Sequence, residues 1–252
     1  GLVVEYAANV TAVHNEVAYF SYTGVSLGFT WTMQAQPMCG GHNIGWNHIH
    51  HLGTPRREMG DALACVYTLG DNGNTVVQNN LCHDVKAFNL GGFGLCQDSG
   101  SSRVHFVSNV VLRTAAAGIQ TQGFNNTFEN NLLYKGYYDS WACPLVPNGG
   151  KEVPFCPWTQ GGLTSAARTG DCGGKAFMPR LLNGSSCPTQ VAFRRNIVLQ
   201  DANKSSLLFQ GLWNTSTHNG WNFEFDQNLY FSEAQDLRTA AVFGGDGWRK
   251  GV

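Results

Sequence analysis

One short pattern recurs seven times along the chain: an apolar residue, two variable residues, an asparagine, one variable residue and a second apolar residue. The repeated asparagines are Asn15, Asn47, Asn80, Asn109, Asn131, Asn196 and Asn228. They lie 32, 33, 29, 22, 65 and 32 residues apart. Self-similarity at a period of roughly 20 to 50 residues is typical of solenoids and other repeat architectures. The repeat therefore restricts the chain to folds built by stacking similar units.

The two apolar residues of each repeat are expected to point into a core from two consecutive short strands, with the asparagine at the bend between them. An asparagine amide can hydrogen-bond an irregular backbone at such a bend. Copies stacked about 4.8 Å apart would form an internal ladder, in which each amide bonds the one above and the one below. The sequence thus predicts an all-β fold, a right-handed parallel β-helix that is a solenoid of about seven coils. A β-propeller is rejected, because its blades need about 40 residues each.

A second set of short strands follows the bends, at residues 24–28, 66–70, 94–98 and 118–122, and is expected to stack into another sheet. The 65-residue gap between Asn131 and Asn196 exceeds one coil, which indicates an excursion at residues 136–189. This segment is interpreted as a looped, disulfide-rich insertion within a single domain, 1–252. Its candidate disulfide cysteines, whose pairing stays open, are Cys143, Cys156, Cys172 and Cys187. Because the chain starts and stops in sequence typical of a coil, we expect it to be truncated at both ends.

Composition narrows the classes of partner. The formal net charge is -1 and only 13% of the residues are charged, which argues against nucleic acid as a partner. No apolar run approaches the roughly 18 to 20 residues that span a bilayer, so no membrane association is predicted. Eight cysteines accompany five N-x-[ST] sequons, which predict a secreted, extracellular glycoprotein with N-linked glycans. The sequon asparagines are Asn9, Asn125, Asn183, Asn203 and Asn214.

Four segments then follow one another in an order found in a known group of proteins: 66–70 (VYTLG), 79–85 (NNLCHDV), 91–95 (GGFGL) and 98–102 (DSGSS). Over residues 40–135, and again over 190–250, the chain resembles the glycoside-hydrolase branch of the right-handed β-helix proteins, which includes fucosidase- and xylanase-like enzymes. The resemblance implies hydrolysis of a glycosidic bond by two carboxylates. Carried over by position, these catalytic residues are Asp61 and Asp98.

The chain departs from that family pattern in three places. Asp61 stands one residue further from Gly70 than the family spacing, and Ser99 replaces the glutamate that usually follows the aspartate. Residues 120–122 (QTQ) stand where the family often has His-Gln-His. Because glutamine does not titrate near neutral pH, a proton-handling role is lost there. A degenerate, non-catalytic member is therefore an alternative interpretation.

Several other side chains are candidates for binding. Trp46 is an aromatic residue in a row of polar, outward-facing positions, where it is either a sugar platform or covered by a loop. Tyr67, Gln120 and Gln122 are further candidates for substrate binding. His50 and His83 follow successive repeat asparagines and are expected to stack; the ladder explains their register, so packing is favoured over a two-histidine metal site. No metal and no cofactor are predicted.

Three functions remain in view. The first is a secreted glycoside hydrolase acting on extracellular polysaccharide. The second is a structural β-helix glycoprotein of an extracellular fibre or appendage, with end-to-end self-association through open terminal rungs. The third is a carbohydrate-binding module that binds glycan without chemistry. A polysaccharide lyase is disfavoured, because no cluster of acidic residues suited to calcium is visible.

Overall fold

The chain folds into parallel β-sheets. A computed structural model describes residues 1–29, 39–53, 63–86, 91–115, 118–136, 145–148, 151–154, 163–165, 190–200, 209–211, 222–232 and 241–243. All regular elements within these ranges are strands, and none of them is a helix. In the same ranges no helix has the length and apolar character needed to cross a membrane.

The strands form three sheets. The seven-stranded sheet contains β3 (Glu16–Ala18), β6 (His48–Leu52), β9 (Leu81–Val85), β11 (Val110–Thr114), β14 (Leu132–Gly136), β19 (Ile197–Gln200) and β22 (Leu229–Ser232). The 14-stranded sheet contains β1 (Leu2–Val4), β2 (Thr11–Val13), β4 (Val25–Leu27), β5 (Asn43–Gly45), β7 (Leu63–Thr68), β8 (Asp71–Gln78), β10 (Gly91–Val107), β12 (Ile119–Phe124), β13 (Asn126–Glu129), β17 (Leu163–Ser165), β18 (Gln190–Arg194), β20 (Phe209–Gly211), β21 (Asn222–Asp226) and β23 (Ala241–Phe243). The strands β15 (Leu145–Asn148) and β16 (Lys151–Pro154) form an antiparallel pair.

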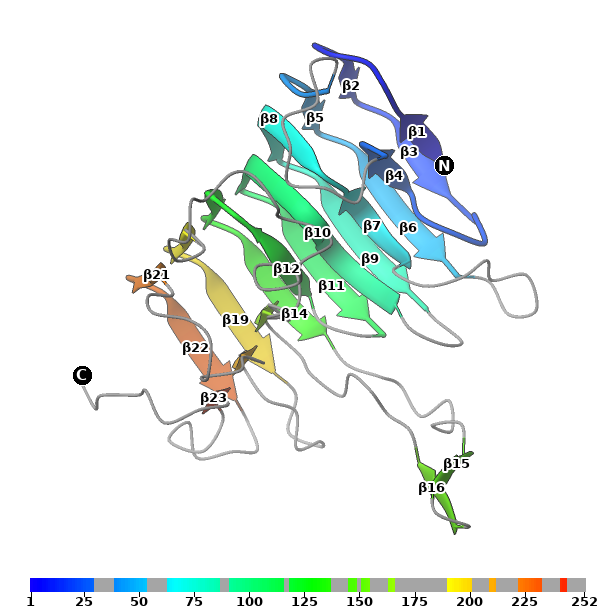
Figure 1. The fold of residues 1–252 in the computed structure, drawn as a ribbon, viewed down its shortest axis with the longest axis vertical. Helices are drawn as coiled ribbons and strands as arrows, with labels where there is room; N and C mark the ends of the chain where they lie inside the picture. The colour runs from blue at the N-terminus through cyan, green and yellow to red at the C-terminus, as the bar shows by residue number, and fades with distance from the viewer. Residues whose placement is uncertain are drawn as a thin grey trace, which may run out of the picture.

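Neighbouring strands in the two large sheets come from successive repeats and run parallel. The seven-stranded sheet has the order β22-β19-β14-β11-β9-β6-β3. The 14-stranded sheet has two branches that share the long strand β10: one runs from β1 through β7 and β12 to β23, and the other from β2 through β8 and β13 to β21. Most repeats therefore add one strand to each of three tracks, which are stacked from the N-terminal to the C-terminal part of the chain (Figure 1). The predicted all-β, parallel architecture is confirmed. Within the described ranges the sheets do not close on themselves, so the right-handed solenoid stays a prediction.

The second strand set predicted from the sequence is also confirmed. Val25 in β4 pairs with Val66 in β7, which pairs with Leu95 in β10, which pairs with Ile119 in β12. The next strand on this branch, β17, lies inside the predicted 136–189 insertion and pairs with both β12 and β20. In the described part of that segment, β17 therefore belongs to the stack. Its four cysteines lie outside the described residues.

The apolar positions of the repeat form the core. Those preceding the asparagine include Ile44, Phe106 and Phe128, and each is fully buried. The rings of Phe106 and Phe128 stack with centroids 4.9 Å apart and planes 9° from parallel. Because burial of a side chain of this size contributes about 1.5–3 kcal/mol, a column of such residues holds successive coils together.

The bend itself is made by the residue before each repeat asparagine. These residues are His14, Trp46, Asn79, Ser108, Asn130, Arg195 and Gln227, and all have φ between 52° and 58°. A left-handed backbone costs a non-glycine residue roughly 1–2 kcal/mol. The prediction placed the irregular backbone at the asparagine; the structure places it one residue earlier, and the asparagine amide stabilises it.

The predicted asparagine ladder is confirmed over all seven repeats. Asn109 shows the pattern: its Oδ1 accepts hydrogen bonds from the backbone N and from Nδ2 of Asn80, at 3.1 and 2.9 Å. Its Nδ2 donates to the carbonyl of Val77 at 2.9 Å and to Oδ1 of Asn131 at 3.0 Å. The same bonds link Asn15 to Asn47, Asn47 to Asn80, Asn131 to Asn196 and Asn196 to Asn228. Each buried amide is therefore satisfied by the adjacent coils.

A disulfide that the sequence analysis does not predict joins two strands inside the core. Cys65 in β7 bonds Cys82 in β9, with their Cα atoms 6.0 Å apart, and both residues are fully buried. Cys82 occupies an inward apolar position of the repeat. The repeat pattern therefore accounts for its burial and does not indicate that it is bonded to another cysteine. Cys39 and Cys96 are free thiols in the described part of the chain.

Replacing Asn109 by alanine is expected to lower the free energy of unfolding by about 3–5 kcal/mol, because several buried backbone and amide groups lose their partners. Asn15→Ala is the matched control: Asn15 is exposed and ends the ladder, so we expect a loss of about 1 kcal/mol or less. Urea unfolding followed by circular dichroism measures both. Equal losses for the two variants would contradict a stabilising role for the buried ladder.

Removing the core disulfide with the double variant Cys65→Ala and Cys82→Ala is expected to destabilise the protein by about 3 kcal/mol, since a cross-link over a separation of 17 residues restricts the unfolded chain. The control Cys39→Ala removes a thiol that is not cross-linked. Peptide mapping of the unreduced protein tests the bond directly. Recovery of Cys65 and Cys82 in separate, alkylated peptides would refute it.

Candidate functional site

The first candidate site lies on the face of strands β7, β10 and β12 that points away from the main core, where its side chains are buried. Val66 and Leu95 belong to the core, so the residues that follow them, Tyr67 and Cys96, face the opposite side of the sheet. Tyr67 pairs in register with Cys96, which pairs with Gln120 on the next strand. Parallel pairing thus sets one side chain from each of three successive coils in a single column.

Asp98 lies two residues beyond this column in β10. Its Oδ2 accepts a hydrogen bond from the Tyr67 hydroxyl at 2.7 Å. Asp98 is 8% exposed and Tyr67 is 5% exposed. Burial raises the pKa of Tyr67 well above its usual value of 10.0, and the nearby charge of Asp98 raises it further. The phenol therefore remains a hydrogen-bond donor to the carboxylate throughout the physiological pH range.

The surroundings of this pair are apolar. Tyr67 and Cys96 belong to a buried cluster with Ala64, Leu69 and Phe93, separate from the main core. Burial raises the pKa of the Cys96 thiol, which lies 3.7 Å from the amide oxygen of Gln120. Gln120 is itself 5% exposed. Three of the predicted site residues (Asp98, Tyr67 and Gln120) are therefore brought together on one face, in an environment of low polarity.

Of the other predicted catalytic and substrate-binding residues, only Trp46 has a described side chain, and it lies away from this pair. Trp46 lies at the bend between β5 and β6, where it is 46% exposed and stacks on His14 with ring centroids 5.6 Å apart. Its predicted outward position is confirmed, but it belongs to a different track from Asp98. Asp61 lies outside the described residues, and so does the side chain of Gln122, although its backbone is part of β12.

Asp71 is the second buried carboxylate in the described ranges, and it has a structural partner. It accepts hydrogen bonds from Nε and Nη2 of Arg103 at 2.9 and 2.6 Å, and from the backbone N of Gly73 at 3.1 Å. This two-pronged ion pair ties the start of β8 to β10. Asp71 therefore stabilises the fold, and we do not count it among the candidate catalytic residues.

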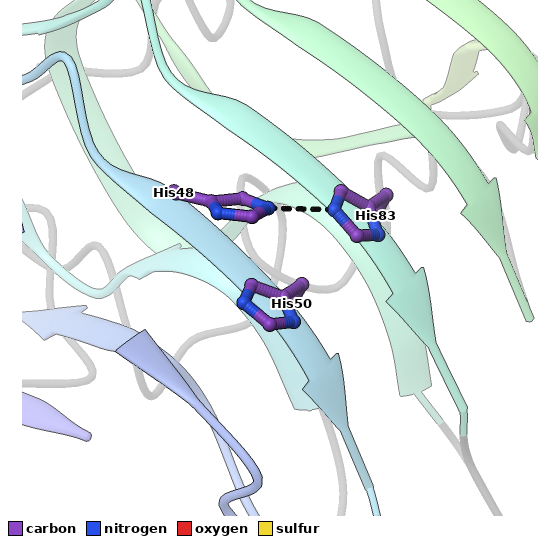
Figure 2. Close-up of side chains that lie close together, drawn as sticks. All are labelled: His48, His50 and His83. Carbon is purple, nitrogen blue, oxygen red and sulfur yellow. Dashed lines mark hydrogen bonds between the residues drawn. The ribbon is translucent and has the colours of Figure 1, made fainter. Parts of the chain in front are cut away.

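A second candidate site lies on the outer face of the seven-stranded sheet. His50 in β6 pairs in register with His83 in β9, and His48 lies two residues before His50 on the same side of the strand. Each of the three imidazoles has a nitrogen within 4.8 Å of the others. The closest approach joins Nε2 of His48 and Nε2 of His83, at 2.7 Å (Figure 2). His50 is 6% exposed, and its two neighbours are partly buried.

A backbone irregularity adds a carboxylate to this cluster. His51 and Asp84 take equivalent positions in β6 and β9 and have φ of 51° and 55°, which interrupts the alternation of side chains along the strand. His83 and Asp84 consequently interact although they are neighbours in sequence, with Nδ1 and Oδ2 2.6 Å apart. Arg113 in β11 donates to both carboxylate oxygens of Asp84, at 2.7 and 2.6 Å. These hydrogen bonds hold the pKa of Asp84 well below its usual value.

The surroundings of His48 favour its uncharged form. Partial burial lowers the pKa of His48, and the positive charges that His50 and His83 would carry lower it further, against an opposing effect of Glu16. Glu16 is 70% exposed, and its Oε1 lies 3.1 Å from Nε2 of His50. A neutral imidazole offers a nitrogen lone pair, which can accept a hydrogen bond or bind a transition metal.

His48 is the member of this cluster that the sequence analysis overlooks. Comparing equivalent places after each repeat asparagine finds His50 and His83, but His48 has no histidine at its own place on the neighbouring coil. The signal that reveals it is the alternation within one strand: in the segment 48–50 (HIH), both histidines project to the same side.

Two of the predicted glycosylation sites lie in the described ranges. Asn9 and Asn125 are both exposed and have φ of 57° and 56°. Asn183, Asn203 and Asn214 lie outside those ranges. The exposed positions leave room for a glycan, and attachment stays a prediction.

Comparison with known proteins gives a likeness among solved structures and none in the other two searches. Neither a scan against protein-family models nor a search of curated proteins finds a match. Among solved structures, the chain is similar to one described as "Glycoside hydrolase", with 25% sequence identity and a TM-score of 0.36. The match covers 54% of this chain and 22% of the other. It thus involves about a fifth of the length of that neighbour.

The buried Tyr67–Asp98 pair predicts a pH-dependent stability. An unfolded tyrosine loses its proton near pH 10, whereas the folded pKa is higher, so stability is lost as the pH rises above about 10. Tyr67→Phe is expected to cost about 2 kcal/mol at pH 8. That difference should shrink by about 1.4 kcal/mol by pH 11. Urea unfolding at both pH values measures it, with Tyr6→Phe as the surface control. A difference that stays constant with pH would contradict the raised pKa.

Proposed function

We propose that the chain is part of a right-handed parallel β-helix that acts on extracellular polysaccharide, with Asp98 as one catalytic carboxylate. The three strand tracks and the asparagine ladder support the solenoid, of which residues 1–252 would form one domain. The observation that carries the functional proposal is the Tyr67–Asp98 hydrogen bond of 2.7 Å at the position where the resemblance to glycoside hydrolases implies an acid.

Glycoside hydrolysis needs a carboxyl group that protonates the leaving oxygen and a second that attacks the sugar or activates water. Asp98 has the features of one of these groups: a fixed orientation, an apolar environment, and a neighbouring coil that supplies Gln120 as a polar contact for a hydroxyl group. Asp61 is our candidate for the second. Tyr67 acts as a positioning residue, because its phenol fixes one oxygen of Asp98.

Secretion is part of the same proposal. The Cys65–Cys82 disulfide supports an oxidising compartment, since such bonds are rare in cytosolic proteins. The exposed positions of Asn9 and Asn125 support N-linked glycosylation. Polysaccharides outside the cell are the substrates that a protein in this compartment meets, and Trp46 provides an exposed ring that suits the C–H face of a sugar.

The test is release of reducing sugar from a panel of xylans and fucosylated glycans by the full-length protein. We expect Asp98→Asn to lower the rate by about 100-fold or more, because a carboxyl group that takes part in proton transfer or attack is lost. Asp226→Asn, at an exposed carboxylate, makes the same change of charge away from the site and should leave the rate unchanged. Circular dichroism confirms that both variants fold.

Two results would overturn the proposal in different ways. Retained activity in Asp98→Asn would show that another group is the acid. Absence of activity on every substrate, from folded wild-type protein, would favour the non-catalytic alternatives, a carbohydrate-binding module or a structural β-helix. Binding to the same glycans without hydrolysis identifies the first, and filaments in electron micrographs identify end-to-end association.

A further inference from the structure

The histidine cluster brings three nitrogen ligands from two successive coils to one point. His48 and His50 come from β6 and His83 from β9, and all three project from the outer face of the seven-stranded sheet (Figure 2). Their nearest nitrogens lie between 2.7 and 4.8 Å apart. In a tetrahedral zinc site with Zn–N bonds of about 2.0–2.1 Å, ligand nitrogens are about 3.4 Å apart. The observed spacings bracket this value, so small side-chain rotations suffice.

One ligand is already oriented by a second group. Nδ1 of His83 faces the carboxylate of Asp84 at 2.6 Å, which leaves Nε2 as the nitrogen that points toward His48. Metal-binding histidines commonly bond a carboxylate through the nitrogen that is not on the metal, which fixes the ring and increases its basicity. Arg113 in turn holds Asp84 from β11 through two hydrogen bonds. Such a chain of contacts is common behind metal-binding histidines.

From this geometry we propose that His48, His50 and His83 bind one divalent transition-metal ion, for which Zn²⁺ is the natural probe. Three imidazoles suit zinc, copper or nickel better than the hard ions magnesium and calcium, which prefer oxygen. Three protein ligands leave a fourth position open for water or another ligand. The ion links β6 to β9 on the outside of the sheet, while Cys82, next to His83, links β9 to β7 on the inside.

The first experiment titrates metal-free, full-length protein with Zn²⁺ in competition with a chromophoric chelator. We expect each chain to bind one zinc ion at this site with a dissociation constant below about 1 μM. The melting temperature should be higher when zinc is present. His50→Ala and His83→Ala should each weaken binding by about 100-fold or more. His14→Ala removes an exposed histidine elsewhere and should bind as wild type does. Asp84→Asn keeps all three ligands and should weaken binding by about 10- to 100-fold.

Cobalt distinguishes this site from cysteine sites. Co²⁺ bound to the wild-type protein should give the visible spectrum of a tetrahedral site without a thiolate-to-cobalt charge-transfer band. A thiolate band, unchanged zinc affinity in folded His83→Ala, or absence of binding at about 100 μM Zn²⁺ would each overturn the proposal. The inference is independent of glycan hydrolysis: Asp98→Asn should bind zinc as wild type does.

Discussion

The asparagine ladder is the interaction on which the rest of the structure depends. Each repeat passes through a left-handed residue that strains the backbone, and the following asparagine bonds the neighbouring repeats on both sides. A coil displaced by one residue would leave these buried amides without partners and would turn core residues such as Phe106 outward. The ladder therefore sets the register, while the spacing between successive repeat asparagines varies from 22 to 65 residues.

Because the register is fixed, residues that are far apart in the sequence lie close together in space. Residues at equivalent places in successive coils lie about 4.8 Å apart, whatever the length of the loop between them. This brings Tyr67 beside Cys96 and Gln120 on one sheet, and His50 beside His83 on the other. Both candidate sites are built in this way, by side chains that the parallel pairing of successive repeats holds in columns.

The sequence predicts those features of the fold and of the sites that recur from one repeat to the next. The asparagines and their flanking apolar residues are predictable, because the same local chemistry recurs seven times. The Cys65–Cys82 bond is not, because it occurs once and Cys82 satisfies the apolar pattern by itself. His48 is missed for a similar reason, since it has no histidine at the equivalent place. The resemblance places Asp98 near Tyr67, but only the coordinates give the hydrogen bond between them.

The left-handed residues connect the scaffold to the histidine cluster. In a regular strand, His83 and Asp84 would project to opposite faces of the sheet, and the carboxylate could not reach its neighbouring imidazole. The φ of 55° at Asp84, repeated at Tyr19, His51 and Arg113 in the adjacent coils, places both groups on the outside. The left-handed backbone at Asp84 thus places the carboxylate that orients His83. Because a left-handed residue recurs at this place in four repeats but only two of them carry the three histidines, the backbone alone does not account for the cluster.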